Sequence, residues 1–236
     1  MNLIAFLAFL VGSILPLIYI PLIIGNPRRV NFRILFYGLG GGLISGLGII
    51  TFKFLFFQKG MHLPTQEVLT LTLFTSLIEA GLLEECFKNG LYLLCLCLLK
   101  KQVNFSSNKY SYFALAAFVG LGFGILETAF YASNLKYEIT IIWDRVYTTI
   151  PAHMIMNILF GFLISERINP VIALLGSISF HAAYDFFAIP STLLGGVLLR
   201  VLLIIGFGFC LWAGKYLLSQ SSQLQSSPKI LGGQKT

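Results

Sequence analysis

Apolar stretches of about 20 residues follow one another along this chain, and each is long enough to cross a bilayer as an α-helix. Inside lipid, only helices and closed barrels satisfy every backbone hydrogen bond. Only 11% of the 236 residues are charged and the mean hydropathy is +0.86, whereas soluble domains carry about 25% charged residues. The sequence therefore predicts an all-α fold, a polytopic helical membrane bundle. About seven transmembrane helices are expected, near residues 3–24, 34–57, 68–99, 111–134, 140–165, 171–189 and 192–218.

No segment is both polar enough and long enough to form a soluble domain. We therefore expect a single transmembrane domain over residues 1–218, with the site-bearing helices at about 68–189. Residues 219–236 are rich in Ser, Gln, Gly and Lys, which predicts a flexible cytoplasmic tail. The chain is thus expected to be a multi-pass integral protein of the cell membrane, in contact with the lipid bilayer.

Basic residues are distributed unequally between the two ends of the predicted spans. The net charge is +7, but there is no basic helix and no nucleic-acid motif, so no nucleic-acid partner is expected. Ten basic residues fall on one side: Arg28, Arg29, Arg33, Lys100, Lys101, Lys109, Arg167, Lys215, Lys229 and Lys235. Four fall on the other: Lys53, Lys59, Lys136 and Arg145. Because cytoplasmic loops carry the excess of Lys and Arg, the N-terminus is expected outside and the C-terminus in the cytoplasm.

Ionisable residues interrupt several of the apolar stretches. At mid-bilayer such a group costs roughly 3 kcal/mol or more, so it is rare without a task or a partner. The key residues are Glu84, Glu85, Glu127, His153, His181 and Asp185. A polar residue follows one turn later in five pairs: Glu84 with Lys88, Glu85 with Asn89, Glu127 with Tyr131, His153 with Asn157, and His181 with Asp185. Since this spacing places both members on one helix face, we interpret the set as one mid-membrane polar site built from four helices.

Each acidic motif taken alone also has a purely structural interpretation. Glu84 and Lys88 can pair within their helix, and such a pair either holds a general base or fixes helix packing. Glu127, with Tyr131 able to donate to it, fits a proton relay or a packing residue as well as a ligand. Nearby, Gly120 and Gly124 form a small-residue ladder that would let this helix approach its neighbours closely.

The two histidines indicate metal chemistry. His153 and His181 lie on consecutive predicted membrane helices, which usually run antiparallel, and a rise of about 1.5 Å per residue places them at similar depth. A catalytic zinc site has three protein ligands and a water, which His153, His181 and one carboxylate, Glu127 in our hypothesis, would provide. A second carboxylate would take the proton of the bound water. In the metal-free alternative a Glu–His pair activates the water directly, and the sequence has no HExxH motif.

The order of these residues resembles the PrsW family of intramembrane proteases. This family lies within the wider group that includes the CAAX prenyl proteases and bacteriocin-immunity proteins. The resemblance rests on four motifs: Glu84-Glu85-x-x-Lys88, Phe123-x-x-x-Glu127, Arg145 leading to His153, and His181-x-x-x-Asp185. CAAX-type members instead carry Arg after the paired acids and His where this chain has Glu127, so the pattern is closer to the PrsW branch.

The resemblance implies a membrane-embedded peptidase that cuts membrane-anchored proteins. In this analogy Glu84 or Glu85 activates water, and Glu127, His153 and His181 complete the site. One divalent metal ion, with zinc favoured, is compatible with this set, and so is a metal-free, glutamate-activated water. The residues expected to support the site are Lys88, Asn89, Tyr131, Arg145 and Asn157.

Two other classes of protein also place ionisable residues inside a membrane. Proton- or cation-coupled transporters and channels use such acids and histidines along their pathways, although this sequence has no clear repeat between its halves. A non-catalytic membrane scaffold of the same fold is the other alternative. Peptide cleavage in detergent, compared with ion flux in liposomes, would separate the three.

Overall fold

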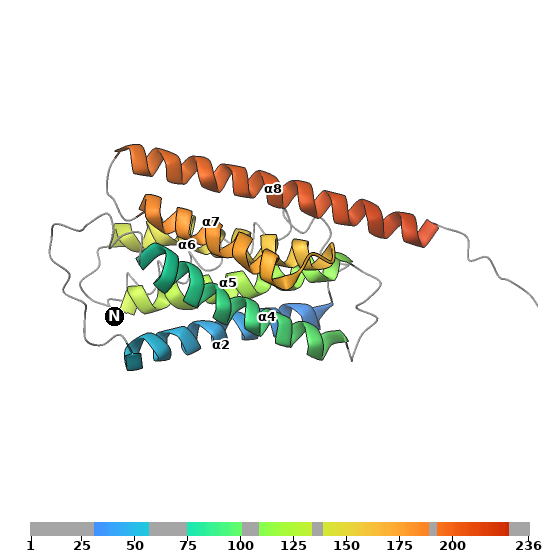
Figure 1. Ribbon diagram of the computed structural model, residues 1–236, viewed down its shortest axis with the longest axis horizontal. Coiled ribbons are helices and arrows are strands. Elements are labelled where there is room, and N and C mark those ends of the chain that lie inside the picture. The colour runs from blue at the N-terminus through green and yellow to red at the C-terminus, as the bar shows by residue number, and fades with distance from the viewer. Residues whose placement is uncertain (1–30, 57–74, 101–108, 134–138, 189–192, 227–236) are drawn as a thin grey trace, which may run out of the picture.

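The computed structural model describes residues 31–56, 75–100, 109–133, 139–188 and 193–226, and within these ranges the regular structure is entirely helical (Figure 1). The elements are α2 (Phe32–Phe56), the π-helix η3 (Thr75–Glu84), α4 (Glu85–Lys100), α5 (Lys109–Ser133), α6 (Ile139–Ser165), α7 (Pro170–Ala188) and α8 (Leu193–Ser226). An all-α fold is thereby confirmed for the described part of the chain.

Five described helices are long and apolar enough to cross a membrane: Phe32–Phe56, Lys109–Ala132, Trp143–Ser165, Pro170–Ala188 and Leu194–Gln220. They correspond to predicted spans within a few residues at most ends. The predicted span 3–24 lies outside the described residues, and the described part of the predicted span 68–99 is not among these five helices, so a count of seven is not confirmed. Helix α8 continues to Ser226 rather than ending near residue 218, since extending an existing helix adds a hydrogen bond for each residue fixed. The remainder of the expected tail, 227–236, lies outside the described residues.

The predicted span 68–99 is described from residue 75 and consists of two kinds of helix. Residues Thr75–Glu84 form a π-helix, and an α-helix of 16 residues follows directly from Glu85. A π-helix has i→i+5 hydrogen bonds, and such segments are rare and frequently occur at functional sites. The change of helix type falls between the two adjacent glutamates, so the directions of their side chains do not follow α-helical periodicity.

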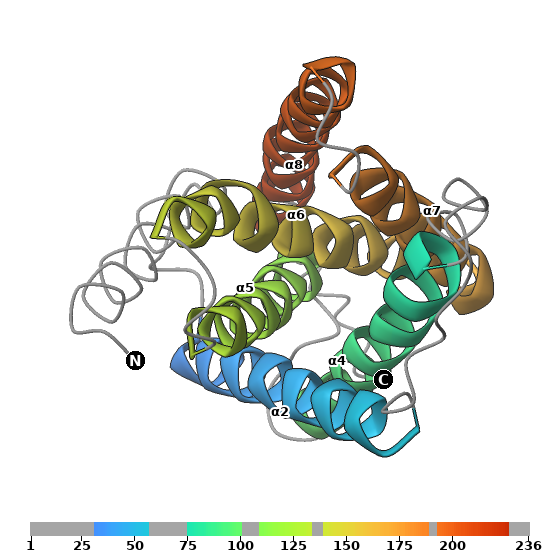
Figure 2. The same cartoon turned by 90° about the vertical axis from the view of Figure 1, so that its left-hand side faces the viewer.

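Helix α5 forms the centre of the bundle, between α2 and α6 (Figure 2). Its residues 113–119 are all buried. The close approach of its neighbours depends on glycine: a Cβ on Gly42 would meet the backbone Cα of Gly122 at 2.9 Å, and one on Gly124 would meet the Cα of Ile150 at 3.0 Å. The predicted role of the Gly120 and Gly124 ladder in helix packing is thereby confirmed.

A tight turn joins α6 to α7. Arg167 has a φ of 61°, and the Ile168 amide donates to the Leu163 carbonyl at 3.0 Å, which closes the C-terminus of α6. Asn169 then caps α7, accepting from the Val171 amide at 2.8 Å, with Pro170 at the first helical position. This short connection makes the two helices antiparallel neighbours and brings the histidines they carry to the same depth.

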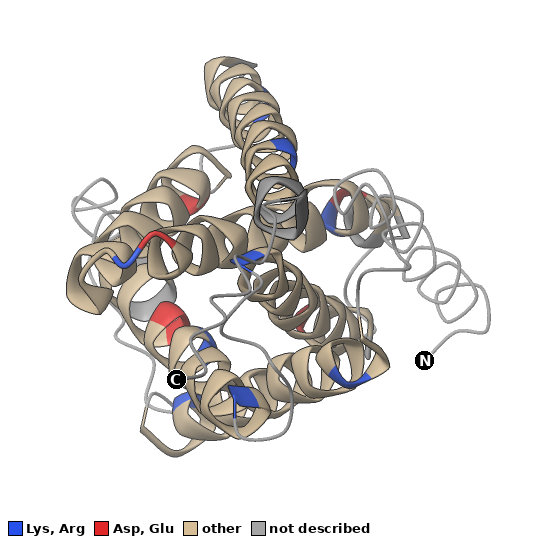
Figure 3. Ribbon diagram, turned by 90° about the vertical axis from the view of Figure 1, so that its right-hand side faces the viewer, with Lys and Arg blue, Asp and Glu red and all other residues tan. Residues whose placement is uncertain are grey.

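Charged residues are sparse on the ribbons (Figure 3). The outward faces carry large apolar side chains instead, including Ile204 at 70% exposure and Val171 at 63%. Such faces are unfavourable in water, since contiguous exposed apolar surface is rare on soluble proteins, and they match the acyl chains of a bilayer.

Candidate active site

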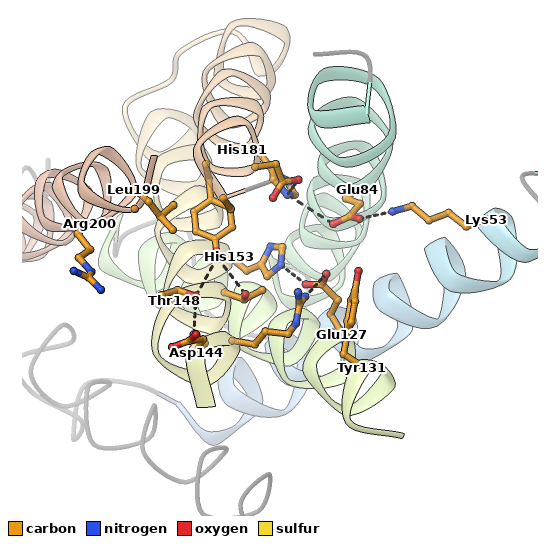
Figure 4. A pocket seen from close by; sticks show the side chains of 16 residues that line it. Lys53, Glu84, Glu127, Tyr131, Asp144, Thr148, His153, His181, Leu199 and Arg200 are labelled. Atoms are coloured by element: carbon orange, nitrogen blue, oxygen red, sulfur yellow. Dashed lines mark hydrogen bonds and ion pairs between the residues drawn. The ribbon is translucent and has the colours of Figure 1, made fainter. Parts of the chain in front are cut away.

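The polar residues predicted from the sequence gather around one cavity of about 540 Å³ (Figure 4). Of the six candidate catalytic residues, Glu84, Glu127, His153, His181 and Asp185 line it. They come from η3, α5, α6 and α7, which are four different segments. Glu85 is fully buried and lies outside the lining.

Glu84 faces helix α2 and the cavity. Its Oε1 accepts a hydrogen bond from Lys53 Nζ at 2.6 Å, and its Oε2 lies 3.8 Å from His181 Nε2 (Figure 4). The predicted pairing of Glu84 with Lys88 is therefore wrong. Because Glu84 ends the π-helix, its side chain turns away from the next α-helical turn, and Lys88 pairs with Glu85 instead, three residues before it.

Glu85 is the centre of a buried polar network. Besides the ion pair with Lys88, it accepts hydrogen bonds from Asn89 Nδ2 at 3.0 Å and from the Ser177 hydroxyl. Its Oε1 also lies 2.7 Å from His181 Nδ1. A carboxylate at Nδ1 favours the tautomer with the proton on Nδ1, in which the Nε2 lone pair faces the cavity. Glu85 thus contacts His181 at Nδ1 and does not line the cavity.

Lys88 links the paired acids to the second histidine. Its ammonium group is fully buried and lies 2.9 Å from His153 Nδ1 and 4.8 Å from the centre of the Phe123 ring. The predicted support of His153 by Asn157 is not found; Asn157 donates to Asn89 at 3.2 Å instead. The i+4 rule fails here because Lys88 and Glu127, on other helices, already occupy the two ring nitrogens of His153.

Glu127 lies between a cation and an imidazole. Its Oε1 accepts from Arg145 at 2.6 Å and its Oε2 lies 2.6 Å from His153 Nε2. Tyr131 also lines the cavity, and the Arg145 guanidinium lies 3.7 Å from the centre of its ring. Both carboxylate oxygens of Glu127 are therefore engaged, and the residue holds His153 and Arg145 in place.

Three residues place ligand atoms close enough to share a metal ion. Glu84, His153 and His181 each offer an atom within 4.8 Å of the others, and all three are buried. The two imidazole rings meet edge to face, with centroids 5.3 Å apart. Two histidines and a carboxylate are a known zinc donor set, so these residues fit a divalent metal. The set differs from the sequence hypothesis in its carboxylate, which is Glu84 rather than Glu127.

Asp185 completes the cavity wall beside His181, with Oδ2 at 3.6 Å from Nε2. The predicted i+4 relation of His181 and Asp185 is confirmed by this contact. In the described ranges, no other hydrogen bond or ion pair engages the Asp185 carboxylate. The Asp185 carboxylate therefore keeps lone pairs open to the cavity beside His181.

Some site residues were not recognised from the sequence. Lys53 was counted as a loop charge although it falls inside the apolar stretch 34–57, and an ionisable residue in such a stretch was the signal that identified the acids. Ser177, which donates to Glu85, and Tyr184, whose hydroxyl lies 3.1 Å from the Thr149 hydroxyl, gave no such signal. A single hydroxyl in an apolar helix is common, so only its neighbours in the fold reveal its role.

The fold and the cavity together define a membrane-embedded helical protein with a buried His/Glu site, the arrangement of an intramembrane hydrolase. The sequence pattern of the PrsW family intramembrane metalloproteases matches residues 32–213, and the chain belongs to this family. The resemblance found in the sequence is confirmed. No curated protein and no solved structure matches the chain. The protein is thus an integral membrane protease of a metalloprotease family.

Proposed function

We propose that this protein hydrolyses peptide bonds of membrane-anchored proteins in the cavity lined by Glu84, His153 and His181. The observation that supports this most directly is the convergence of these three buried side chains from η3, α6 and α7 within 4.8 Å. The cavity of about 540 Å³ is large enough to admit an extended segment of peptide together with water.

Glu84, His153 and His181 would hold one divalent metal ion, and zinc is the metal that this donor set favours. Such a metal, when bound, would act as a Lewis acid that polarises the scissile carbonyl and activates water. At His153 a metal would replace one of the contacts with Lys88 and Glu127, while at His181 the Nε2 atom already faces the cavity. The orienting contact of Glu85 with His181 Nδ1 is of the kind that strengthens a histidine ligand.

Asp185 is the group we assign to move the proton. Glu85 does not line the cavity, Glu84 would serve as a ligand, and both oxygens of Glu127 are held. Asp144 also lines the cavity, but among the described residues Asp185 is the aspartate whose carboxylate lies beside a histidine of this group. The Asp185 carboxylate would accept a proton from the attacking water and deliver it to the nitrogen of the leaving amine as the C–N bond breaks. Peptide and water thereby give a carboxylic acid and an amine.

Arg145 is placed to stabilise the charge that develops on the carbonyl oxygen. It lines the cavity beside Glu127, and its buried Nε has no hydrogen-bond partner in the part of the chain that the structure describes. A guanidinium has five donors, of which Glu127 uses a minority. Donors fixed in advance at a developing oxyanion are worth about 10²–10³ in rate.

The positions of the basic residues support an orientation of the protein in the membrane. Lys53 and Arg145 are engaged with Glu84 and Glu127, so they are site residues rather than loop charges. Removing them from the count increases the charge asymmetry between the two sides. We propose that the N-terminus lies outside and the C-terminus in the cytoplasm. Residues 1–218 would form a single transmembrane domain. A substrate helix would unwind locally to expose a peptide bond to the site.

Cleavage by the purified protein in detergent is the test of this function. Wild-type protein is expected to cleave a peptide that includes a transmembrane segment and its flanks, to lose that activity on treatment with a chelator, and to regain it with Zn²⁺. Cleavage that survives complete removal of metal would contradict the metal assignment. Ion flux in liposomes without any cleavage would support the transporter alternative instead.

Substitution Lys53→Met is expected to raise the affinity for Zn²⁺ by about 2- to 5-fold, because a partly exposed ion pair of this kind is worth at most about 1 kcal/mol. In the wild type the ammonium competes with metal for Glu84. Calorimetric titration of Zn²⁺ into the detergent-solubilised protein measures the change. The matched control is Lys109→Met, which removes a lysine paired at 3.0 Å with Glu166, outside the cavity. An unchanged or weakened affinity in Lys53→Met would contradict the competition.

A further inference from the structure

A second cavity, of about 370 Å³, adjoins the catalytic cavity. Lys53, Glu84, Glu127 and Tyr131 line both of them. The two spaces therefore meet at the Lys53–Glu84 ion pair and the Glu127 carboxylate, so an occupant of the second cavity would lie directly beside the groups assigned to hydrolysis.

The remaining walls of the second cavity are almost entirely apolar. They come from α2 and α5 and consist of Gly46, Ile49, Ile50, Phe54, Phe123 and Phe130, with Thr51 as the one further polar residue. Ile49 and Phe123 are buried. Charge is thus confined to the end that the second cavity shares with the catalytic one.

The outer rim of this cavity opens toward the apolar surface of the bundle. Phe54 and Phe130 both line it, and they are 63% and 54% exposed. In a membrane protein such a face contacts acyl chains, so an apolar side chain passes from lipid into this cavity without crossing water. The backbone of the residue that carries this side chain would meet hydrogen-bonding groups only at the end that the second cavity shares with the catalytic cavity.

We infer that this cavity is a specificity subsite that binds a large apolar side chain of the substrate, adjacent to the scissile bond. The inference rests on the proposed peptidase function and adds to it the class of residue selected. A cavity near the lower end of the 300–1,000 Å³ range of ligand sites suits one side chain rather than a whole ligand. The shared wall of Lys53, Glu84 and Glu127 places the backbone of that residue against the catalytic groups.

A variant that fills the cavity tests the inference. Ile50→Trp adds bulk at a half-buried position in its wall, and Leu47→Trp adds the same bulk to α2 at a position 55% exposed and outside the lining. Matched peptides carrying Phe, Leu, Ala or Asp at each position around the cut site are supplied to the purified protein, and kcat/KM is measured.

The wild type is expected to prefer Phe or Leu over Ala at one position by about 10-fold or more, as apolar pockets do when several methylene groups are at stake. Ile50→Trp should abolish that preference while still cleaving the Ala peptide, and Leu47→Trp should retain it. A second variant, Ile50→Ala, enlarges the cavity and should shift the preference toward Trp.

The outcomes separate the two proposals. Cleavage by the wild type with no apolar preference, or a preference equal in Ile50→Trp and Leu47→Trp, overturns the subsite and leaves the peptidase function standing. Loss of activity in Ile50→Trp to the same degree for every peptide would instead indicate a bound acyl chain or a structural wall, and also overturns the subsite. Absence of cleavage by the wild type for all peptides overturns both.

Discussion

Replacement of Glu84 by glutamine is expected to lower the rate of peptide cleavage by about 10³-fold or more while the protein still inserts and folds. The substitution removes the carboxylate from the Glu84–His153–His181 group but keeps its shape. Metal-assisted polarisation and water activation are worth several kcal/mol, and roughly 4 kcal/mol corresponds to that factor in rate. His181→Ala should have a similar effect, since it removes a second ligand of the same group.

Glu166→Gln is the matched control for this experiment. Glu166 is also a glutamate paired with a lysine, Lys109 at 3.0 Å, but it lies outside the cavity lining. We expect its activity to stay close to that of the wild type, because a partly exposed ion pair contributes at most about 1 kcal/mol. Bound metal is measured in parallel, and Glu84→Gln should retain less of it. Full activity of purified Glu84→Gln would refute the assignment of the site.

The largest loss of stability is expected for Glu85→Gln. This change leaves the ammonium of Lys88, which is fully buried, without its counter-charge inside the bundle. Breaking a buried ion pair by removing one partner costs about 3–5 kcal/mol. The free energy of unfolding in detergent, followed by denaturant titration, should fall by this amount, far more than for Glu166→Gln.

The double variant Glu85→Gln with Lys88→Met separates the contribution of Glu85 to stability from its contribution to metal binding and cleavage. Removing both charges leaves no unpaired ion, so most of the lost stability should return. The carboxylate contact with His181 Nδ1 is still missing, however. Metal affinity and cleavage rate should therefore stay about 10- to 100-fold below the wild type, the range found when groups that orient a ligand histidine are removed. If metal affinity and cleavage rate returned to wild-type values together with stability, Glu85 would have only a structural role.

The helices and most of the site residues could be predicted because both depend on local composition. Helix α5 was expected at 111–134 and is found at Lys109–Ser133, since a run of apolar residues in lipid must form intrahelical hydrogen bonds. His153 and His181 were expected at the same depth, and their rings lie 5.3 Å apart. That agreement follows from counting residues along two antiparallel helices joined by a short turn.

Partners within the site were predicted less well. The expected Glu84–Lys88 pair assumed α-helical periodicity, but a π-helix ends at Glu84, and Lys88 pairs with Glu85 instead. Glu84 pairs with Lys53, which lies 31 positions earlier on α2. The carboxylate of the three-residue ligand group is Glu84 rather than Glu127. This too depends on tertiary contacts, because Arg145 and His153 already occupy the two oxygens of Glu127.

The sequence alone determined that the chain lies in the membrane and which acids and histidines gather at the candidate site, because the cost of an ionisable group in lipid depends on that residue and its local surroundings. Only the tertiary structure decided how those residues are paired and oriented. Helix rotation and contacts across the bundle determine which acid faces the cavity, which acid contacts a histidine and which cation neutralises each acid. Pattern spacing within a single helix does not contain that information.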